Sequence, residues 1–154
     1  MIEPDSPPDD EHLMARAVAR AEHSRLLAPP NPWVGAVVVT PDGVTFDGST
    51  RRPGGAHAER HVLARAGDAA RGATMYVTLE PCLMCAGAIF LSRIERLVYA
   101  ASDPKRGALG SVVNVSTNEA LNHHTEIESG LMKHECSSLL SAFFEELRRK
   151  ARSE

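Results

Sequence analysis

A hairpin signal near the start of the chain limits the kind of sheet that this sequence can form. Residues 34–40 are a continuous valine-rich run, Pro41-Asp42-Gly43 is a turn signal, and residues 44–48 can return as a second strand. A run that is apolar at nearly every position predicts a strand buried on both faces. The turn between the two runs predicts that the strands pair in antiparallel fashion.

Helices and strands alternate after this hairpin, and two helices flank the whole arrangement. The expected elements are helices over 11–27, 57–67, 82–92 and 130–149, and strands over 74–79 and 97–101. This order predicts a mixed sheet with helices on both faces. We expect a single domain over 10–154, after an acidic, proline-rich and disordered lead-in at 1–9.

Net charge and cysteine content limit the classes of function. The 154 residues carry a formal net charge of −3, so no basic field over the whole protein indicates nucleic-acid binding, although a local basic patch is compatible with it. Three cysteines do not make a disulfide framework and suit a reducing compartment. No apolar run approaches the roughly 20 residues of a membrane helix, and the start does not resemble a secretion signal. We expect a cytoplasmic protein without membrane contact.

Four residues at two expected helix starts carry the chemistry. A catalytic zinc takes three protein ligands and keeps its fourth position for water, and His57, Cys82 and Cys85 supply one nitrogen and two sulfurs. Bound zinc lowers the pKa of its water to about 7. Glu59 can take the proton of that water and deliver it to a ring nitrogen and the leaving ammonia. We therefore expect Zn²⁺ as the cofactor and Glu59 as the catalytic residue.

Other interpretations of these residues are weaker. A structural zinc site needs a fourth ligand, and Cys136, the only further cysteine, lies on the expected apolar stripe of the last helix. His61 follows His57 by one helical turn, but a metalloprotease helix has the order His-Glu-x-x-His, and here Glu59 is displaced. We expect His61 to be packed or at the surface, and His123-His124 to be polar loop residues.

The combination of His57-Ala58-Glu59 with Pro81-Cys82-Leu83-Met84-Cys85 is the signature of zinc nucleobase deaminases. The chain resembles the cytidine deaminase superfamily. Its second half resembles bacterial tRNA-specific adenosine deaminases, and its first half resembles the deaminase domain of riboflavin-pathway enzymes. The matching stretches are Tyr76-Val77-Thr78-Leu79-Glu80-Pro81 and Asp103-Pro104-Lys105-Arg106-Gly107 for the former, and Asn31-Pro32-Trp33-Val34-Gly35 for the latter. The resemblance implies a three-layer α/β/α fold with a mixed five-stranded sheet, and a homodimer.

The substrate stays open between two interpretations. A deaminase of the tRNA wobble adenosine would contact the anticodon loop through residues 103–111 and the basic end at 148–152. A small-molecule deaminase would act on a free base, a nucleoside or a riboflavin-type aminopyrimidine. The net charge and the lack of an asparagine at 49–52, where the tRNA enzymes generally have one, favour this alternative. A non-catalytic zinc module would not need Glu59. The candidate substrate contacts are Asn31, Thr50, Ala58, Asp103, Lys105 and Arg106.

Overall fold

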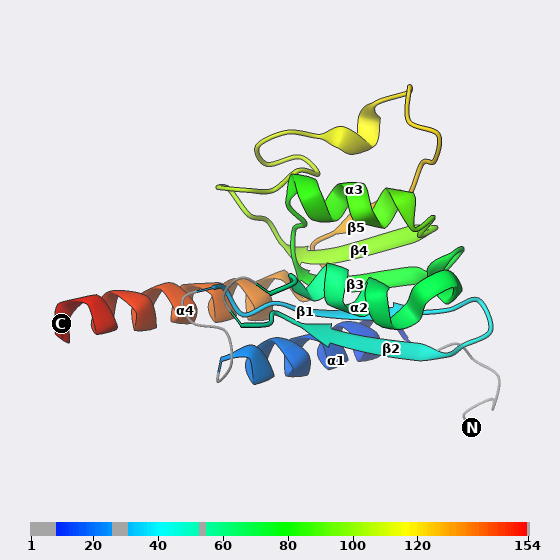
Figure 1. Cartoon of the computed structure of the whole chain (residues 1–154). Helices are drawn as coiled ribbons and strands as arrows, with labels where there is room; N and C mark the ends of the chain where they lie inside the picture. The colour runs from blue at the N-terminus through cyan, green and yellow to red at the C-terminus, as the bar shows by residue number, and fades with distance from the viewer. Residues whose placement is uncertain (1–8, 26–30, 53–54, 154) are drawn as a thin grey trace.

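The computed structural model describes residues 9–25, 31–52 and 55–153, and these form a three-layer α/β/α unit (Figure 1). The sheet order is β2-β1-β3-β4-β5. The strands are β1 (Gly35–Val39), β2 (Thr45–Ser49), β3 (Thr74–Leu79), β4 (Arg96–Ala101) and β5 (Glu126–Ser129). Strand β1 pairs antiparallel with β2 and β3, whereas β3, β4 and β5 run parallel. The expected hairpin and the mixed five-stranded sheet are confirmed.

Two helices cover each face of the sheet. The helices are α1 (Asp10–Ser24), α2 (Ala58–Ala66), α3 (Leu83–Leu91) and α4 (Lys133–Ser153), with short 3₁₀ turns η1 (Gly67–Ala70) and η2 (Val115–Thr117). Helices α2 and α3 lie on one face, and α1 and the first part of α4 on the other (Figure 1). Alternate residues of β1 enter opposite core layers, with Val38 on the α2 side and Val37 on the α1 side. Both faces of the sheet are therefore buried, as a continuous apolar run requires.

Two glycines let helices approach the hairpin closely. A Cβ atom on Gly35 would lie 1.9 Å from the carbonyl oxygen of Ala17 in α1. A Cβ atom on Gly48 would lie 2.8 Å from the carbonyl oxygen of Ala58, the first residue of α2. Since no side chain fits at either contact, glycine at position 48 fixes the distance between β2 and the start of α2. That contact places the residues around 57–59 against the end of the sheet.

The structure corrects several expected boundaries. Helix α1 begins at Asp10, with the Asp9 side chain accepting from the Glu11 N–H, and its expected end near 27 lies outside the described residues, as do positions 1–8 of the lead-in. Helix α4 begins at Lys133 and continues to Ser153, beyond the expected end at 149. Among the described residues, no helix has the length and apolar character needed to cross a bilayer.

Candidate metal centre and substrate cavity

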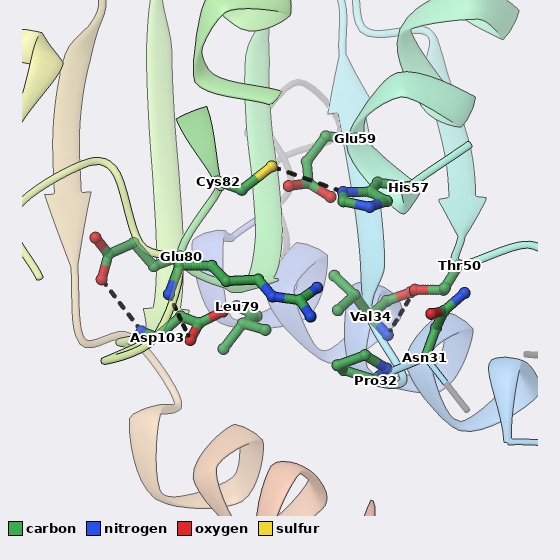
Figure 2. A pocket seen from close by; sticks show the side chains of 11 residues that line it. Asn31, Pro32, Val34, Thr50, His57, Glu59, Leu79, Glu80, Cys82 and Asp103 are labelled. Atoms are coloured by element: carbon green, nitrogen blue, oxygen red, sulfur yellow. Dashed lines mark hydrogen bonds between the residues drawn. The ribbon is translucent and has the colours of Figure 1, made fainter. Parts of the chain in front are cut away.

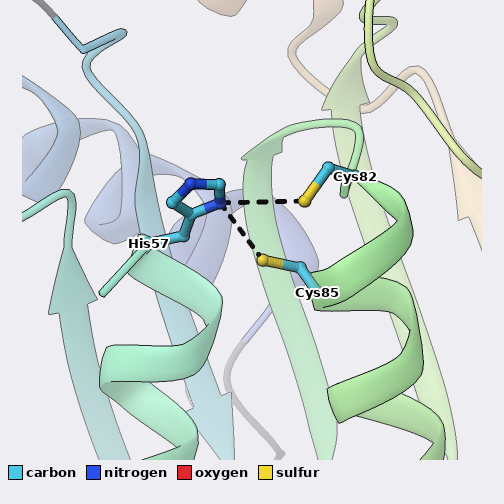
Figure 3. A group of neighbouring side chains, drawn as sticks. All are labelled: His57, Cys82 and Cys85. Carbon is cyan, nitrogen blue, oxygen red and sulfur yellow. Dashed lines mark hydrogen bonds between the residues drawn. The ribbon is translucent and has the colours of Figure 1, made fainter. Parts of the chain in front are cut away.

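The two helices on one face of the sheet present three potential metal ligands at their N-terminal ends. His57 is the N-cap residue of α2 and Cys82 the N-cap residue of α3, both with extended backbone, and neither side chain makes a capping hydrogen bond. Cys85 is buried in the first turn of α3. Helices α2 and α3 are in contact, so their starts bring the three side chains together (Figure 3).

The distances between the three donor atoms fit a tetrahedral zinc ion. His57 Nδ1 lies 3.7 Å from Cys82 Sγ and 3.4 Å from Cys85 Sγ. With ordinary zinc–nitrogen and zinc–sulfur bond lengths, a nitrogen and a sulfur at two corners of a tetrahedron are about 3.5 Å apart. The three donors could therefore hold one ion and leave a fourth corner open. In the part of the chain that the structure describes, this is the one group of three or more such residues with metal-ligand spacing.

The two thiols are in unequal environments. The hydrogen bond from Cys85, helped by charge interaction with His57, lowers the pKa of the Cys82 thiol to about 5. The same contact with Cys82, together with burial and the nearby Glu59 carboxylate, raises the pKa of Cys85. Since zinc binds thiolates, Cys82 is prepared for coordination, and Cys85 must release its proton when a cation arrives.

Glu59 lies in the first turn of α2, beside the three donors. Its carboxylate points toward His57 and Cys82 (Figure 2), and the residue is only 4% exposed. Burial is the main cause that raises the pKa of Glu59, and the negative Cys82 acts in the same direction. A buried carboxyl group with a raised pKa, beside three candidate metal ligands and lining a cavity, is suited to receive and return a proton.

A cavity opens in front of this group (Figure 2). The residues that line it and that carry polar groups are Asn31, Thr50, His57, Glu59, Glu80, Cys82, Asp103 and Arg106. The Thr50 hydroxyl accepts from the N–H of Val34, the residue before β1, at 3.1 Å, so its position is fixed by the start of that strand. The cavity therefore contains the proposed ligands His57 and Cys82, Glu59, and four of the six candidate substrate contacts.

The other two candidate contacts lie outside this cavity. Ala58 is fully buried in the first turn of α2. Lys105 lines a neighbouring cavity of about 230 Å³, and its ammonium group lies 5.1 Å from the ring centroid of Phe144. The two cavities share Pro32, Asp103 and Arg106, so the second cavity continues the first along α4.

The sequence did not predict a role for Glu80, a buried charged residue that is part of the cavity lining. Glu80 is 2% exposed and follows β3 directly. The position of Glu80 in the sequence could have indicated a role, because a charged residue at the carboxyl end of a buried strand lies where ligands bind in sheets of this type.

The remaining polar residues that the sequence singled out have structural roles. His61 accepts from the Ser49 N–H through Nδ1 at 3.3 Å, and burial lowers the pKa of its ring. Cys136 is buried in the core below α4, which raises the pKa of its thiol to about 12. The ring of His123 lies 2.7 Å from the Ile94 carbonyl oxygen through Nε2. None of the three belongs to the metal group of the described residues.

Comparison with known families shows that one family model spans the candidate metal ligands. Residues 7–101 match the family described as the cytidine and deoxycytidylate deaminase zinc-binding region. That span contains all three candidate ligands and Glu59.

Individual relatives come from both groups that the sequence resembles. A tRNA-specific adenosine deaminase of Bacillus subtilis is 50% identical over 103 residues, which cover 64% of this chain and 64% of that protein. The riboflavin biosynthesis protein RibD of Escherichia coli is 34% identical over 145 residues, which cover 90% of this chain and 38% of that protein. The matched segments thus span less than two thirds of these curated relatives.

Solved structures give the same two groups. A structure from a study of A-to-I editing by tRNA:A34 deaminases superposes with a TM-score of 0.72 and 35% identity, covering 84% of this chain and 99% of that chain. RibD of Acinetobacter baumannii superposes with a TM-score of 0.75 and 31% identity, covering 87% of this chain and 38% of that chain. The expected fold type is confirmed, and so is the resemblance to both groups. The assignment of one group to each half of the chain stays a prediction.

Proposed function

The chain belongs to the cytidine and deoxycytidylate deaminase family, and from this premise we propose that it is a zinc-dependent hydrolase that removes an exocyclic amine from a nucleobase. One observation carries the proposal. His57 Nδ1, Cys82 Sγ and Cys85 Sγ have the spacing of three corners of a zinc tetrahedron, and the buried Glu59 carboxylate lies beside them in the same cavity.

In the proposed mechanism the three ligands bind the metal and Glu59 transfers protons. When bound, zinc supplies a nucleophile at neutral pH because it lowers the pKa of a coordinated water. His57, Cys82 and Cys85 would hold the cation. Glu59 takes one proton of the water and gives it to the ring nitrogen, then moves the second proton, from the added hydroxyl, to the amine, which leaves as ammonia. Water is added and ammonia is lost, so a carbonyl replaces the exocyclic amine.

For the substrate we propose the wobble adenosine of tRNA. The Bacillus subtilis relative and the structure from the A34-deaminase study support this choice. The shape of the site supports it as well, since the cavity continues into a second one with an aromatic ring and a cation, Phe144 and Lys105. Splayed single-stranded nucleotides bind through base stacking on aromatic rings and through phosphate contacts with cations.

A small-molecule substrate is the second candidate, and two observations favour it. Asn31, which belongs to the stretch that resembles riboflavin-pathway enzymes, lines the cavity beside Thr50 (Figure 2). The RibD relative also matches a larger share of this chain than the Bacillus subtilis relative does. A phosphoribosylated aminopyrimidine is the corresponding substrate class.

Ammonia release from a substrate panel tests both candidates. Zinc-loaded protein is incubated with an anticodon stem-loop carrying a wobble adenosine, with free adenine, guanine and cytosine and their nucleosides, and with a phosphoribosylated diaminopyrimidine. Turnover of the stem-loop with inosine as product supports the tRNA proposal. Turnover of small substrates without the stem-loop supports the second candidate, and ammonia from none of them contradicts the proposed deaminase activity.

We propose that the protein is cytoplasmic and that it forms a homodimer, the latter as the family resemblance implies. Helix α3 exposes large apolar side chains at both of its ends, where Leu83 is 60% and Leu91 is 83% exposed. Large apolar side chains at this exposure are suited to a contact with a second copy. Sedimentation equilibrium measures the molecular mass in solution, and a monomer at micromolar concentration would contradict the expectation.

A further inference from the structure

Glu80 connects the strand that leads into the cysteine segment with the loop that forms one wall of the cavity. Its buried carboxylate receives four hydrogen bonds, all from the loop at residues 103–111. The N–H groups of Asp103, Leu109 and Ser111 donate at 3.2, 3.0 and 3.2 Å, and the Ser111 hydroxyl donates as well. A charged group left without partners in the interior would be costly, so these donors and the carboxylate stabilise each other.

Gly107 shows how closely the loop is fitted around this carboxylate. A Cβ atom at position 107 would lie 2.3 Å from the Glu80 Cδ, and its three nearest neighbours would all be atoms of the Glu80 carboxylate. The next residue, Ala108, donates its N–H to the Pro81 carbonyl at 2.9 Å, and Gly107 forms an isolated β-bridge with Cys82. The loop therefore lies along the segment 80–82, which delivers a candidate zinc ligand.

The loop in turn places two polar side chains at the cavity. Asp103 and Arg106 line it on the side where Glu80 lies. The Asp103 carboxylate accepts from the N–H groups of Lys105 and Arg106 at 3.0 and 3.2 Å, which fixes the turn between them. Figure 2 shows the bond from the Asp103 N–H to Glu80 at the base of this turn. Both ends of the loop thus depend on the same carboxylate.

We propose that Glu80 is a positioning residue for substrate binding: its carboxylate holds the loop at 103–111 so that Asp103 and Arg106 form one wall of the substrate cavity. The proposal rests on the deaminase function proposed above. It gives Glu80 no part in proton transfer, because among the described residues the hydrogen bonds of its carboxylate are all to the loop and none is to the three candidate ligands. Loss of the carboxylate should weaken substrate binding while zinc and Glu59 stay in place.

The first test separates KM from kcat. In Glu80→Gln, an amide NH₂ faces loop N–H donors, so about half of the hydrogen bonds are lost. We expect KM for the wobble-adenosine stem-loop to rise roughly tenfold or more, with kcat per bound zinc within about twofold of the parent. Glu119→Gln, which removes the same charge from an exposed loop position, should match the parent. A fall in kcat and zinc content at unchanged KM would show that Glu80 only stabilises the fold.

The second test does not require any enzymatic activity, so it distinguishes failure of this proposal from failure of the proposed function. Trypsin cleaves after Lys105 and Arg106, both exposed in the loop, and after the exposed Arg71 elsewhere. In zinc-loaded Glu80→Gln, cleavage after Lys105 and Arg106 should accelerate at least several-fold, while cleavage after Arg71 keeps its rate. Equal acceleration at all three sites, or at none, would overturn the proposal. Ser111→Ala, which removes one hydrogen bond, provides a milder variant with the same expected direction.

The third test uses the contact with Gly107. Gly107→Ala inserts a methyl group into the Glu80 carboxylate, so alone it should raise KM and speed cleavage after Lys105 and Arg106 as Glu80→Gln does. In a Glu80→Ala background the space is free, and adding Gly107→Ala should change either quantity by less than about twofold. If the effects of the two substitutions on KM and on cleavage rate multiply in the double variant, the two positions act independently. That result would contradict the proposal that Glu80 and the loop act together.

Discussion

His57 and Cys82 occupy the same position on two neighbouring helices, because each is the N-cap residue, with extended backbone and without a capping hydrogen bond from its side chain. An N-cap side chain ordinarily satisfies an N–H of the first turn. Here both side chains turn toward each other instead, to 3.7 Å between Nδ1 and Sγ. The starts of α2 and α3 therefore give up local stability to assemble a ligand group.

Zinc content should depend on Cys85 and not on Cys136. We expect about one zinc per chain in the parent, and loss of most of it in Cys85→Ala, since two remaining protein ligands do not hold the ion in a catalytic site. Cys136→Ala is the matched control: it removes a buried thiol from the other face of the sheet, so it should lower the melting temperature but keep the zinc. Atomic absorption on the purified proteins measures the zinc content, and thermal unfolding measures the melting temperature. Zinc loss in Cys136→Ala would indicate a closed structural site.

Glu59 should be required for turnover but not for metal binding. Glu59→Ala is expected to keep its zinc and to lose a factor on the order of 10² to 10⁴ in kcat, because the proton of the attacking water has no acceptor. Steady-state ammonia release at fixed zinc content gives the comparison. Glu59→Gln keeps the size of the side chain and should lose nearly as much. Near-normal turnover in either variant would remove Glu59 from the mechanism.

The fold was predictable where the chain is buried on both faces. Residues 34–40 are apolar because β1 lies between α1 and α2, so the sequence itself carries the signal for a central strand. Strand β5 carries no such signal. Its four residues, Glu126–Ser129, are mostly exposed at the edge of the sheet, and it forms because β4 offers free backbone groups to pair with. A local sequence pattern does not predict an edge strand whose formation depends on pairing with a neighbouring strand.

The site divides in the same way. His57, Glu59, Cys82 and Cys85 were accessible to sequence reasoning because zinc chemistry restricts residue type and spacing within short segments. Glu80 was not, because its partners lie 23 to 31 positions further along the chain. A carboxylate that binds a loop distant in the sequence has no characteristic spacing from its partners. Its contacts can be recognised only in the folded structure.

An ion-pair network away from the site should make stability depend on pH. Two nitrogens of Arg96 donate to Asp10 at 2.9 and 2.7 Å, and these bonds, with the one from the Tyr76 hydroxyl, lower the pKa of Asp10 from 3.8 to about 2. A pKa lowered by folding stabilises the protein above the unfolded pKa, near 4, and this contribution disappears as pH falls toward 2. Arg96→Met should therefore cost about 1 kcal/mol near neutral pH, given the partial exposure of the pair.

That cost should shrink between about pH 4 and pH 2. Urea unfolding of the parent and Arg96→Met over this range measures the difference, and any loss of zinc in acid affects both proteins alike. Arg71→Met, which removes an exposed arginine outside the network, should show no such trend. A difference that stays constant down to pH 2 would mean that Arg96 acts by packing and not through Asp10.

The exposed cations near the second cavity should matter only if the substrate is a nucleic acid. Arg148, Arg149, Lys150 and Arg152 are exposed on the last turns of α4, which extends beyond the sheet (Figure 1). Replacing these four by glutamine keeps the helix and removes its positive end. For a stem-loop substrate KM should rise several-fold, and its dependence on salt should become shallower, because fewer phosphate contacts release counterions.

A single substitution separates the contribution of the second cavity to substrate binding from that of the basic end of α4. Lys105→Gln removes the cation that lies over the Phe144 ring, whereas Lys133→Gln removes one at the opposite end of α4. If tRNA is the substrate, Lys105→Gln should raise KM for the stem-loop and leave turnover of a free nucleoside unchanged, while Lys133→Gln should do neither. A small-molecule enzyme would respond in the opposite way: the helix end and Lys105 would be dispensable, and Asn31→Ala in the cavity would raise KM instead. Turnover of small substrates alone, unaffected by any of the basic-residue changes, would exclude the tRNA proposal while leaving the zinc deaminase intact.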